Sequence, residues 1–112
     1  MDVFFRDKKL GKLAGNPSLC KREMGALRAK LFLIRLSDLY KAPNLEFLRH
    51  YPGHWHELTG NRKGQWACNL DQPYRLIFTV HEGTPSDHQQ GSYIWAAIDS
   101  VDILEITNYH GK

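Results

Sequence analysis

The chain has 112 residues, of which 42% are hydrophobic and 12% aromatic, and its formal net charge is +3. This length suits one domain with one small core, and the composition excludes a disordered polar tail. The two cysteines, Cys20 and Cys68, are too few for a disulfide framework. We find no signal peptide and no apolar run long enough for a membrane span, so we expect a single cytoplasmic domain over residues 1–112.

Positive charge is concentrated in the first half of the chain. Residues 1–63 hold 13 of the 15 Lys and Arg residues and 6 of the 12 acids, and residues 64–112 hold the remainder. A basic segment of this kind suits a phosphate-rich partner such as nucleic acid. The same composition is also typical of an ordinary solvated helix face, so charge alone does not identify the partner.

The first segments predict a short strand and two helix starts. Residues 2–5 favour a strand at the edge of the sheet, and residues 6–13 favour a short, weakly amphipathic helix. Asn16 is expected to cap the next helix. Pro17 is expected at its first position, because the N–H that proline lacks has no partner there in any case.

One long helix is predicted over residues 18–40. Such a helix must bury one face, and the sheet is the expected partner. Residues 41–43 end it, and residues 44–50 favour one more helical turn. The expected buried stripe consists of Met24, Leu27, Leu31 and Ile34, widened by Leu33, Leu36 and Leu39.

The centre of the chain predicts an antiparallel hairpin. Residues 65–70 and 74–80 alternate apolar and polar side chains on either side of a turn at residues 71–73, which is typical of half-buried strands. Arg75 falls on the polar phase and is expected to face away from the core. The apolar phase consists of Trp66, Cys68, Leu70, Tyr74, Leu76, Phe78 and Val80.

The last third of the chain predicts a loop and two strands. Residues 82–91 are polar and turn-rich and favour a loop. Residues 93–97 and 101–106 favour strands, although Ile106 is out of phase with the apolar residues before it. Together, the segments predict an α+β fold in which helices cover a small antiparallel sheet.

Four polar residues lie at or near the ends of predicted strands: His56, Arg75, Tyr109 and His110. If the strands are neighbours, these ends converge at one edge of the sheet. Two histidines and an arginine suit RNA cleavage by its own 2′-hydroxyl, with one group taking the 2′-proton and another protonating the leaving 5′-oxygen. Arginine suits the phosphorane because it stays charged, and a tyrosine can stack on a base or position the hydroxyl.

Each of these residues also has a purely structural interpretation. His110 can be a frayed terminal side chain, His56 a strand residue facing water, and Arg75 the partner of a C-terminal acid. The spacing of His50, His54 and His56 is one that zinc ligands can have. A zinc site needs a fourth ligand, however, and the sequence pattern supplies none. We therefore expect no metal and no cofactor.

A basic turn is predicted between Gly60 and Gly64. It is not a phosphate-binding loop, because no helix is predicted to follow it. We interpret it as a tight turn that offers Arg62 and Lys63 to phosphate.

Four short motifs follow one another along the second half of the chain. They are His56-Glu57-Leu58-Thr59-Gly60, Arg62-x-Gly64-x-Trp66, Tyr74-Arg75-Leu76-Ile77-Phe78 and Asn108-Tyr109-His110. In order and spacing the chain resembles the HigB branch of the RelE/ParE toxins, small bacterial proteins of toxin–antitoxin modules. The resemblance lies mainly in residues 54–80 and 100–110.

This resemblance implies two N-terminal helices packed on a small, curved antiparallel sheet, the RelE-like toxin fold. It implies a metal-independent endoribonuclease that cuts messenger RNA in the ribosomal A site and so inhibits translation and growth. It also implies a cognate antitoxin, HigA-like with a helix-turn-helix. Operator DNA would be bound only indirectly, through the complex with that antitoxin.

The resemblance also implies roles for individual residues. His56 matches the histidine that takes part in cleavage, and Arg75 matches the strand arginine that faces the scissile phosphate. Tyr109 and His110 match the end of the family's Asp-Tyr-His signature. The basic turn after Gly60 would help to hold ribosomal or messenger RNA.

The sequence departs from the family pattern at three places. Asn108 stands where the signature usually has an acid, Thr59 replaces a common lysine, and the loop at residues 82–91 is longer than typical. Two alternatives therefore stay open. One is a ParE-like toxin that blocks gyrase by binding, although that branch lacks the histidines; the other is a catalytically inactive member.

Overall fold

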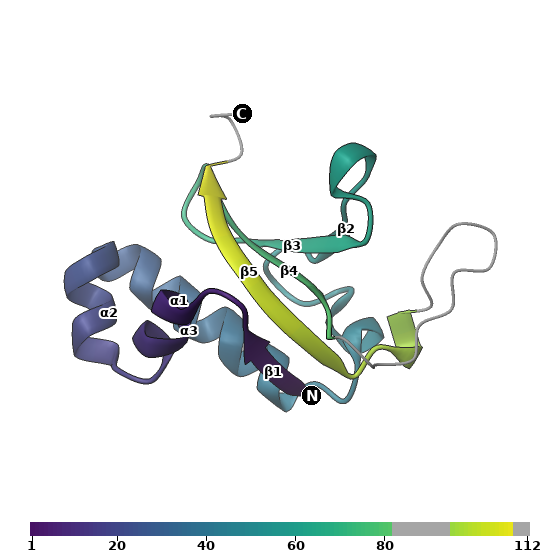
Figure 1. Cartoon of the computed structure of the whole chain (residues 1–112), viewed down its shortest axis with the longest axis horizontal. Helices are drawn as coiled ribbons and strands as arrows, with labels where there is room; N and C mark the ends of the chain where they lie inside the picture. The colour runs from purple at the N-terminus through teal and green to yellow at the C-terminus, as the bar shows by residue number, and fades with distance from the viewer. Residues whose placement is uncertain (82–94, 109–112) are drawn as a thin grey trace.

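The computed structural model describes residues 1–81 and 95–108. In this part of the chain, three α-helices accompany a five-stranded sheet that is not closed (Figure 1). The helices are α1 (Lys8–Ala14), α2 (Pro17–Met24) and α3 (Ala26–Lys41). The strands are β1 (Asp2–Phe5), β2 (His56–Glu57), β3 (Gln65–Asn69), β4 (Tyr74–Val80) and β5 (Ser100–Asn108). The α+β class is confirmed, with three helices where the resemblance implied two.

The strands follow the order β1-β5-β4-β3-β2. Residues 2–5 form an edge strand as predicted, but β1 pairs with β5 in parallel, so the expectation of a purely antiparallel sheet is wrong. A parallel pair needs a long crossover, and all three helices lie in the chain between β1 and β5. The other neighbouring pairs are antiparallel.

The central hairpin confirms the alternation read from the sequence. Trp66 is the Cα partner of Phe78, and Cys68 is the partner of Leu76; all four are buried in one hydrophobic core. Residues of the other phase face away from that core. Because strand residues alternate between faces, this register decides which side chains each face of the sheet carries.

A bulge in β5 explains the phase of Ile106. The register shifts where Ile77 pairs with Glu105 while Phe78 pairs with Ile103, so β5 has one extra residue there. An extra residue moves the following side chains to the opposite face. Ile106 therefore packs against the core with Ile103, although the two lie three positions apart.

The predicted single helix over residues 18–40 is wrong, because it breaks at Gly25. Asn16 caps α2 as predicted, its side-chain oxygen accepting a hydrogen bond from the Leu19 N–H at 3.1 Å, and Pro17 opens the helix. Gly25 then adopts φ 88° and ψ 158°, a conformation that only glycine reaches without strain. The chain changes direction there, so the spacing of buried residues in α3 does not continue the spacing in α2.

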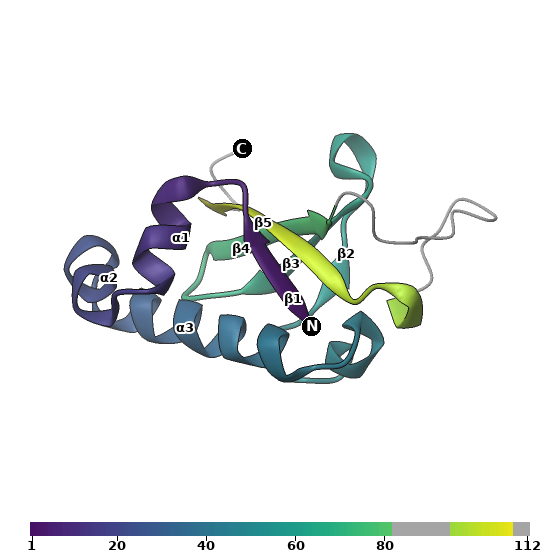
Figure 2. The ribbon, with the colours of Figure 1, turned by 60° about the horizontal axis from the view of Figure 1, so that its bottom comes forward.

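The buried face of α3 differs from the predicted stripe. Leu27 is 60% exposed and Ile34 40% exposed, so neither is part of the core. The residues that α3 buries recur at spacings of three and four, and they are Ala29, Phe32, Leu36 and Leu39. Their side chains join those of β3, β4 and β5 in the core, and α3 runs along this face of the sheet (Figure 2).

Two arginines of α3 attach the helix to the ends of the hairpin. Arg28 binds the Asp71 carboxylate through Nε at 3.0 Å and lies 3.5 Å from the centre of the Tyr74 ring. Hydrogen bonds from Arg28 hold the pKa of Asp71 below its usual value. Arg35 donates from Nε to the Asn69 carbonyl at 2.8 Å. Both contacts fix the hairpin turn over the helix.

Some of the predictions for the remaining segments are confirmed and one is wrong. Residues 44–50 contain the predicted helical turn, η1 (Leu45–Leu48), and residues 60–62 form a second, η2 (Gly60–Arg62). The strand predicted over residues 93–97 is wrong where it is described, because Trp95–Ala97 is the 3-10 turn η4. The loop predicted at residues 82–91 lies outside the described residues. Within the described ranges, no helix has the length and apolar character needed to cross a membrane.

Replacing Gly25 with alanine tests the break between α2 and α3. A methyl group at this position would meet no atom within 4 Å, so backbone strain is the only cost. We expect Gly25→Ala to lower the free energy of unfolding by about 1–3 kcal/mol in urea denaturation.

If residues 18–40 formed one continuous helix, Gly25→Ala would instead raise the free energy of unfolding. Alanine is favoured over glycine inside a helix by about 1 kcal/mol. Gly15→Ala is the matched control. Gly15 has a negative φ and room for a methyl group, so we expect no loss of stability there.

Candidate functional site

The face of the sheet opposite the core, called the outer face below, carries the polar phase of the strands. One cross-strand row runs through His56, Ala67, Ile77 and Glu105, and the next through Asn69, Arg75 and Thr107. A third row contains Phe4, Asp102, Thr79 and Gln65. Ala67 and Ile77 are buried although they lie on this face, so they form an apolar floor among polar neighbours.

His56 is placed on the outer face by the residues before it. Trp55 is buried, packs edge-on against Phe78 and donates from its indole N–H to the Pro52 carbonyl at 3.0 Å. Alternation then turns His56 to the opposite face, where it pairs with Ala67 of β3. The His54 and His56 rings lie 4.3 Å apart. His56 is therefore held by a buried anchor rather than carried on a free loop.

The contacts of His56 define which nitrogen carries the proton. Nδ1 lies 2.8 Å from the His54 carbonyl oxygen, which can only accept, so Nδ1 donates. Nε2 lies 3.3 Å from Nη1 of Arg75, which can only donate, so Nε2 accepts. Both contacts agree on the neutral Nδ1–H tautomer. Arg75, predicted to leave the core, is thus brought next to His56 as the sequence suggested.

The surroundings of His56 favour the neutral ring. Burial lowers the pKa of His56 below its ordinary value of 6.5, and the charge of Arg75 adds to this effect, while the hydrogen bond to His54 opposes it. At neutral pH the ring is therefore uncharged with a basic Nε2. An unprotonated nitrogen beside a fixed guanidinium can accept a proton near an anion that the guanidinium binds.

Arg62 contacts other side chains of the protein. Its guanidinium donates to Glu105 of β5 at 2.8 Å and to the Gln65 side chain at 2.8 Å, so it is already paired. It still reaches over the outer face, from the η2 turn to β5. Lys63, the other residue predicted for phosphate, is exposed at the end of that turn. The turn is basic, and Arg62 remains partly exposed beside the exposed Lys63.

Tyr109 and His110 lie outside the described residues, so their placement relative to His56 is untested. The strand that leads to them is described as far as Asn108, which is the Cα partner of Tyr74. The preceding residue, Thr107, is the partner of Arg75. The described end of β5 thus lies beside the strand position of Arg75.

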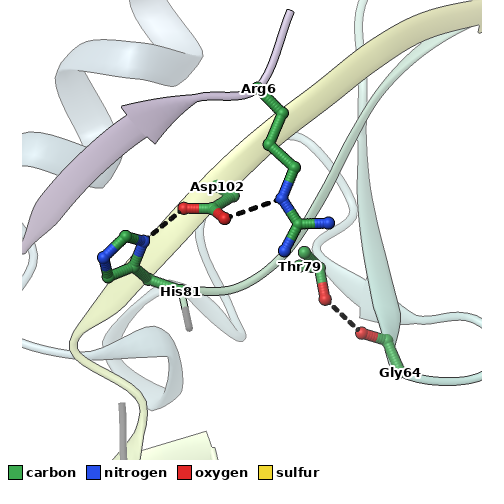
Figure 3. A network of polar contacts seen from close by, with 5 residues as sticks. All are labelled: Arg6, Gly64, Thr79, His81 and Asp102. Atoms are coloured by element: carbon green, nitrogen blue, oxygen red, sulfur yellow. Dashed lines mark hydrogen bonds and ion pairs between the residues drawn. The ribbon is translucent and has the colours of Figure 1, made fainter. Parts of the chain in front are cut away.

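A second polar cluster was not predicted (Figure 3). Asp102 is only 5% exposed and accepts from Arg6 Nε at 2.9 Å and from His81 Nδ1 at 2.5 Å. The Phe4 ring stacks on His81 with ring centres 4.0 Å apart. Four residues from β1, the end of β4 and β5 therefore meet at one place on the outer face.

The cluster could not be predicted from strand alternation because of the bulge in β5. Asp102 and Glu105 lie three positions apart, and strict alternation would put them on opposite faces. The extra residue places both on the outer face, where Asp102 binds Arg6 and Glu105 binds Arg62. The out-of-phase Ile106 was the available signal.

The histidines do not assemble into a metal site among the described residues. No group of three or more His, Cys, Asp or Glu side chains there is arranged to hold a metal ion. His54 and His56 are neighbours, but His56 uses one nitrogen for a carbonyl and the other for Arg75.

Comparison with known proteins adds no family assignment. No protein-family model matches the chain, and no curated protein is significantly similar to it. The site must therefore be interpreted from its own geometry.

Titration of the His56 ring by nuclear magnetic resonance tests this geometry without any assumption about function. We expect the neutral ring to carry its proton on Nδ1 and the pKa to lie below 6.5. Arg75→Gln should raise the pKa, because it removes a positive charge that disfavours the imidazolium. Lys63→Gln, which removes an exposed charge not in contact with His56, is the matched control. A His56 pKa at or above 6.5, or one unaffected by Arg75→Gln, would contradict the arrangement.

Proposed function

We propose that the protein is the toxin of a type II toxin–antitoxin system, a ribosome-dependent endoribonuclease that cuts messenger RNA. The observation that carries this proposal is the contact between His56 and Arg75 on the outer face. It brings together a neutral imidazole and a permanent cation, two of the groups that RNA cleavage by its 2′-hydroxyl requires. The motif order from His56 to His110 supports the same class.

In the proposed reaction, Nε2 of His56 takes the proton of the 2′-hydroxyl. The 2′-oxygen attacks the adjacent phosphorus, a P–O2′ bond forms and the P–O5′ bond breaks. The products are a 2′,3′-cyclic phosphate and a 5′-hydroxyl, with the proton for the leaving oxygen supplied by His110 or Tyr109. Protein groups supply the base, the acid and the cation in this scheme, so the proposed reaction needs no metal or cofactor.

Arg75 has two effects in this scheme. Its fork of N–H donors can bind two phosphate oxygens and stabilise the charge that develops on the phosphorane. Together with burial, which is the larger cause, its charge also lowers the pKa of His56 in the free protein, so the base is unprotonated at neutral pH. When a phosphate draws the guanidinium away from Nε2, that nitrogen becomes available for the 2′-proton.

The other basic residues would hold the RNA. Lys63 is exposed and can bind a phosphate directly, whereas Arg62 must exchange Glu105 for phosphate. The 13 basic residues in the first 63 positions supply the wider positive field that attracts ribosomal and messenger RNA.

The proposal extends to fold family, partner and place of action. The helices and sheet would correspond to the RelE-like arrangement, with α1, α2 and α3 in place of its two helices. A HigA-like antitoxin with a helix-turn-helix would bind and inhibit the toxin, and operator DNA would be contacted through that complex. The protein would act in the cytoplasm. Asn108 replaces the family's usual acid, so His56 is the more important base here.

Inducible expression in a bacterium, with growth and new transcript 5′ ends followed together, tests the proposal. We expect growth arrest and cuts within codons for the unaltered protein. His56→Ala should reduce cutting by about a hundredfold or more, because it removes the general base. Arg75→Ala and His110→Ala should reduce it as well.

His50→Ala is the matched control, since His50 is exposed and lies outside the outer-face site. We expect it to arrest growth like the unaltered protein. Arrest with intact transcripts would point instead to a binding target such as gyrase, to be examined in a supercoiling assay. The absence of arrest would indicate an inactive member, with Asn108 as the first residue to restore to aspartate.

A further inference from the structure

The cluster of Phe4, Arg6, His81 and Asp102 is not used by the proposed reaction. It lies on the same outer face as Arg75 but at the other end of β4. His81 is six residues beyond Arg75, about 20 Å of extended chain. The cluster therefore has no direct part in chemistry at His56, and its composition needs a separate explanation.

Asp102 is the organising residue of this cluster. Its side chain is 7% exposed, and each carboxylate oxygen accepts one hydrogen bond, Oδ2 from Arg6 and Oδ1 from His81 (Figure 3). A buried carboxylate with two such partners holds both side chains in fixed orientations. Arg6 directly follows β1 and His81 directly follows β4, so the arrangement also ties the end of β1 to the end of β4.

Arg6 and His81 use only some of their hydrogen-bonding groups to contact Asp102. Within residues 1–81 and 95–108, the hydrogen bonds of Arg6 and His81 side chains are those to Asp102. The two terminal amino groups of Arg6 and Nε2 of His81 thus remain available, and the Arg6 side chain is 55% exposed. A planar guanidinium with two free amino groups matches the oxygens of a phosphate.

Phe4 adds an aromatic surface to the same cluster, because its ring stacks on His81. It is 44% exposed although its ring stacks on His81 at an interplanar angle of 18°. An exposed aromatic ring next to a phosphate-binding cation is the combination that proteins use for single-stranded nucleic acid, because bases stack on the ring while the cation binds the backbone.

We propose that Phe4, Arg6 and His81 form a second binding site for single-stranded RNA. Arg6 binds a phosphate, Phe4 stacks on a neighbouring base, and Asp102 holds Arg6 and His81 in place. The choice of RNA as ligand rests on the proposed function, since the same strand would reach from this cluster to the scissile phosphate at Arg75.

The outer face provides a continuous path between the two ends. Phe4 and Asp102 share a cross-strand row with Thr79 and Gln65, and Gln65 binds Arg62. Arg62 then reaches Glu105 in the row next to that of Arg75. Arg6, Arg62 and Arg75 are each held by a side-chain contact on this face, to Asp102, Glu105 and His56 respectively. They can bind successive phosphates of one extended strand.

Fluorescence anisotropy with a labelled, single-stranded 2′-O-methyl oligoribonucleotide tests this site. That RNA cannot be cleaved through its 2′-oxygen, so binding is measured apart from catalysis. We expect Arg6→Gln and Phe4→Leu each to weaken binding about fivefold or more. Arg6→Gln should also reduce the slope of log K against log salt by about 0.7, the value for one lost phosphate contact to a single strand.

Arg22→Gln is the matched control, because it removes the same charge from an exposed position on α2. We expect it to leave affinity within about twofold of the parent. Thermal unfolding of each variant establishes that binding is measured on folded protein. Arg6→Lys, which keeps the charge beside Asp102 but lacks the fork, should bind less tightly than the parent.

Three results would overturn the second site: no binding by the parent protein, parent-like affinity in Arg6→Gln and Phe4→Leu, or an equal loss in Arg22→Gln. Transcript cutting in the same variants separates this outcome from failure of the proposed function. Normal cutting with parent-like RNA affinity in both variants would retain the nuclease and reject the second site. Weakened RNA affinity without any cutting by the unaltered protein would retain an RNA-binding face and reject the nuclease.

Discussion

The register of β4 between β3 and β5 is the constraint on which the rest of the structure depends. On one side of β4, Leu76 and Phe78 enter the core that α3 covers; on the other, Arg75 and Thr79 face outward. A slip of one residue would exchange these faces, burying a guanidinium and exposing the core. The strong preference for a buried apolar face therefore also fixes where the polar groups of the site lie.

The bulge in β5 gives this face its charge pattern. Without the extra residue, Asp102 and Glu105 could not both face outward, and Arg6 and Arg62 would lack their partners. The two acids hold two arginines in place through charge-assisted hydrogen bonds, while the arginine side chains stay partly exposed to solvent. His56 and Arg75 differ from these pairs because the imidazole and the guanidinium contact each other directly. Burial is the main cause of the lowered pKa of His56, and the positive charge of Arg75 adds to it.

Much of this arrangement could be predicted from the sequence where a signal was local. The hairpin followed from alternation, the cap at Asn16 followed from its side chain, and Arg75 was correctly placed off the core. The predictions failed where one residue changed the phase. Gly25 ends a helix whose apolar spacing continues across it, so the buried face of α3 was misassigned. The parallel pairing of β1 and the cluster around Asp102 depend on contacts between residues about 100 positions apart, which no local pattern reveals.

The most direct measurement is the pH dependence of single-turnover RNA cleavage, compared with the pKa of His56 measured by nuclear magnetic resonance in the same variant. If His56 is the base, cleavage falls as the pH drops through the His56 pKa, below 6.5 in the unaltered protein, because the imidazolium cannot accept a proton. In Arg75→Gln the remaining activity should fall at a higher pH, following the raised pKa. Cleavage that stays constant across the range in which His56 titrates would contradict a catalytic role for this pair.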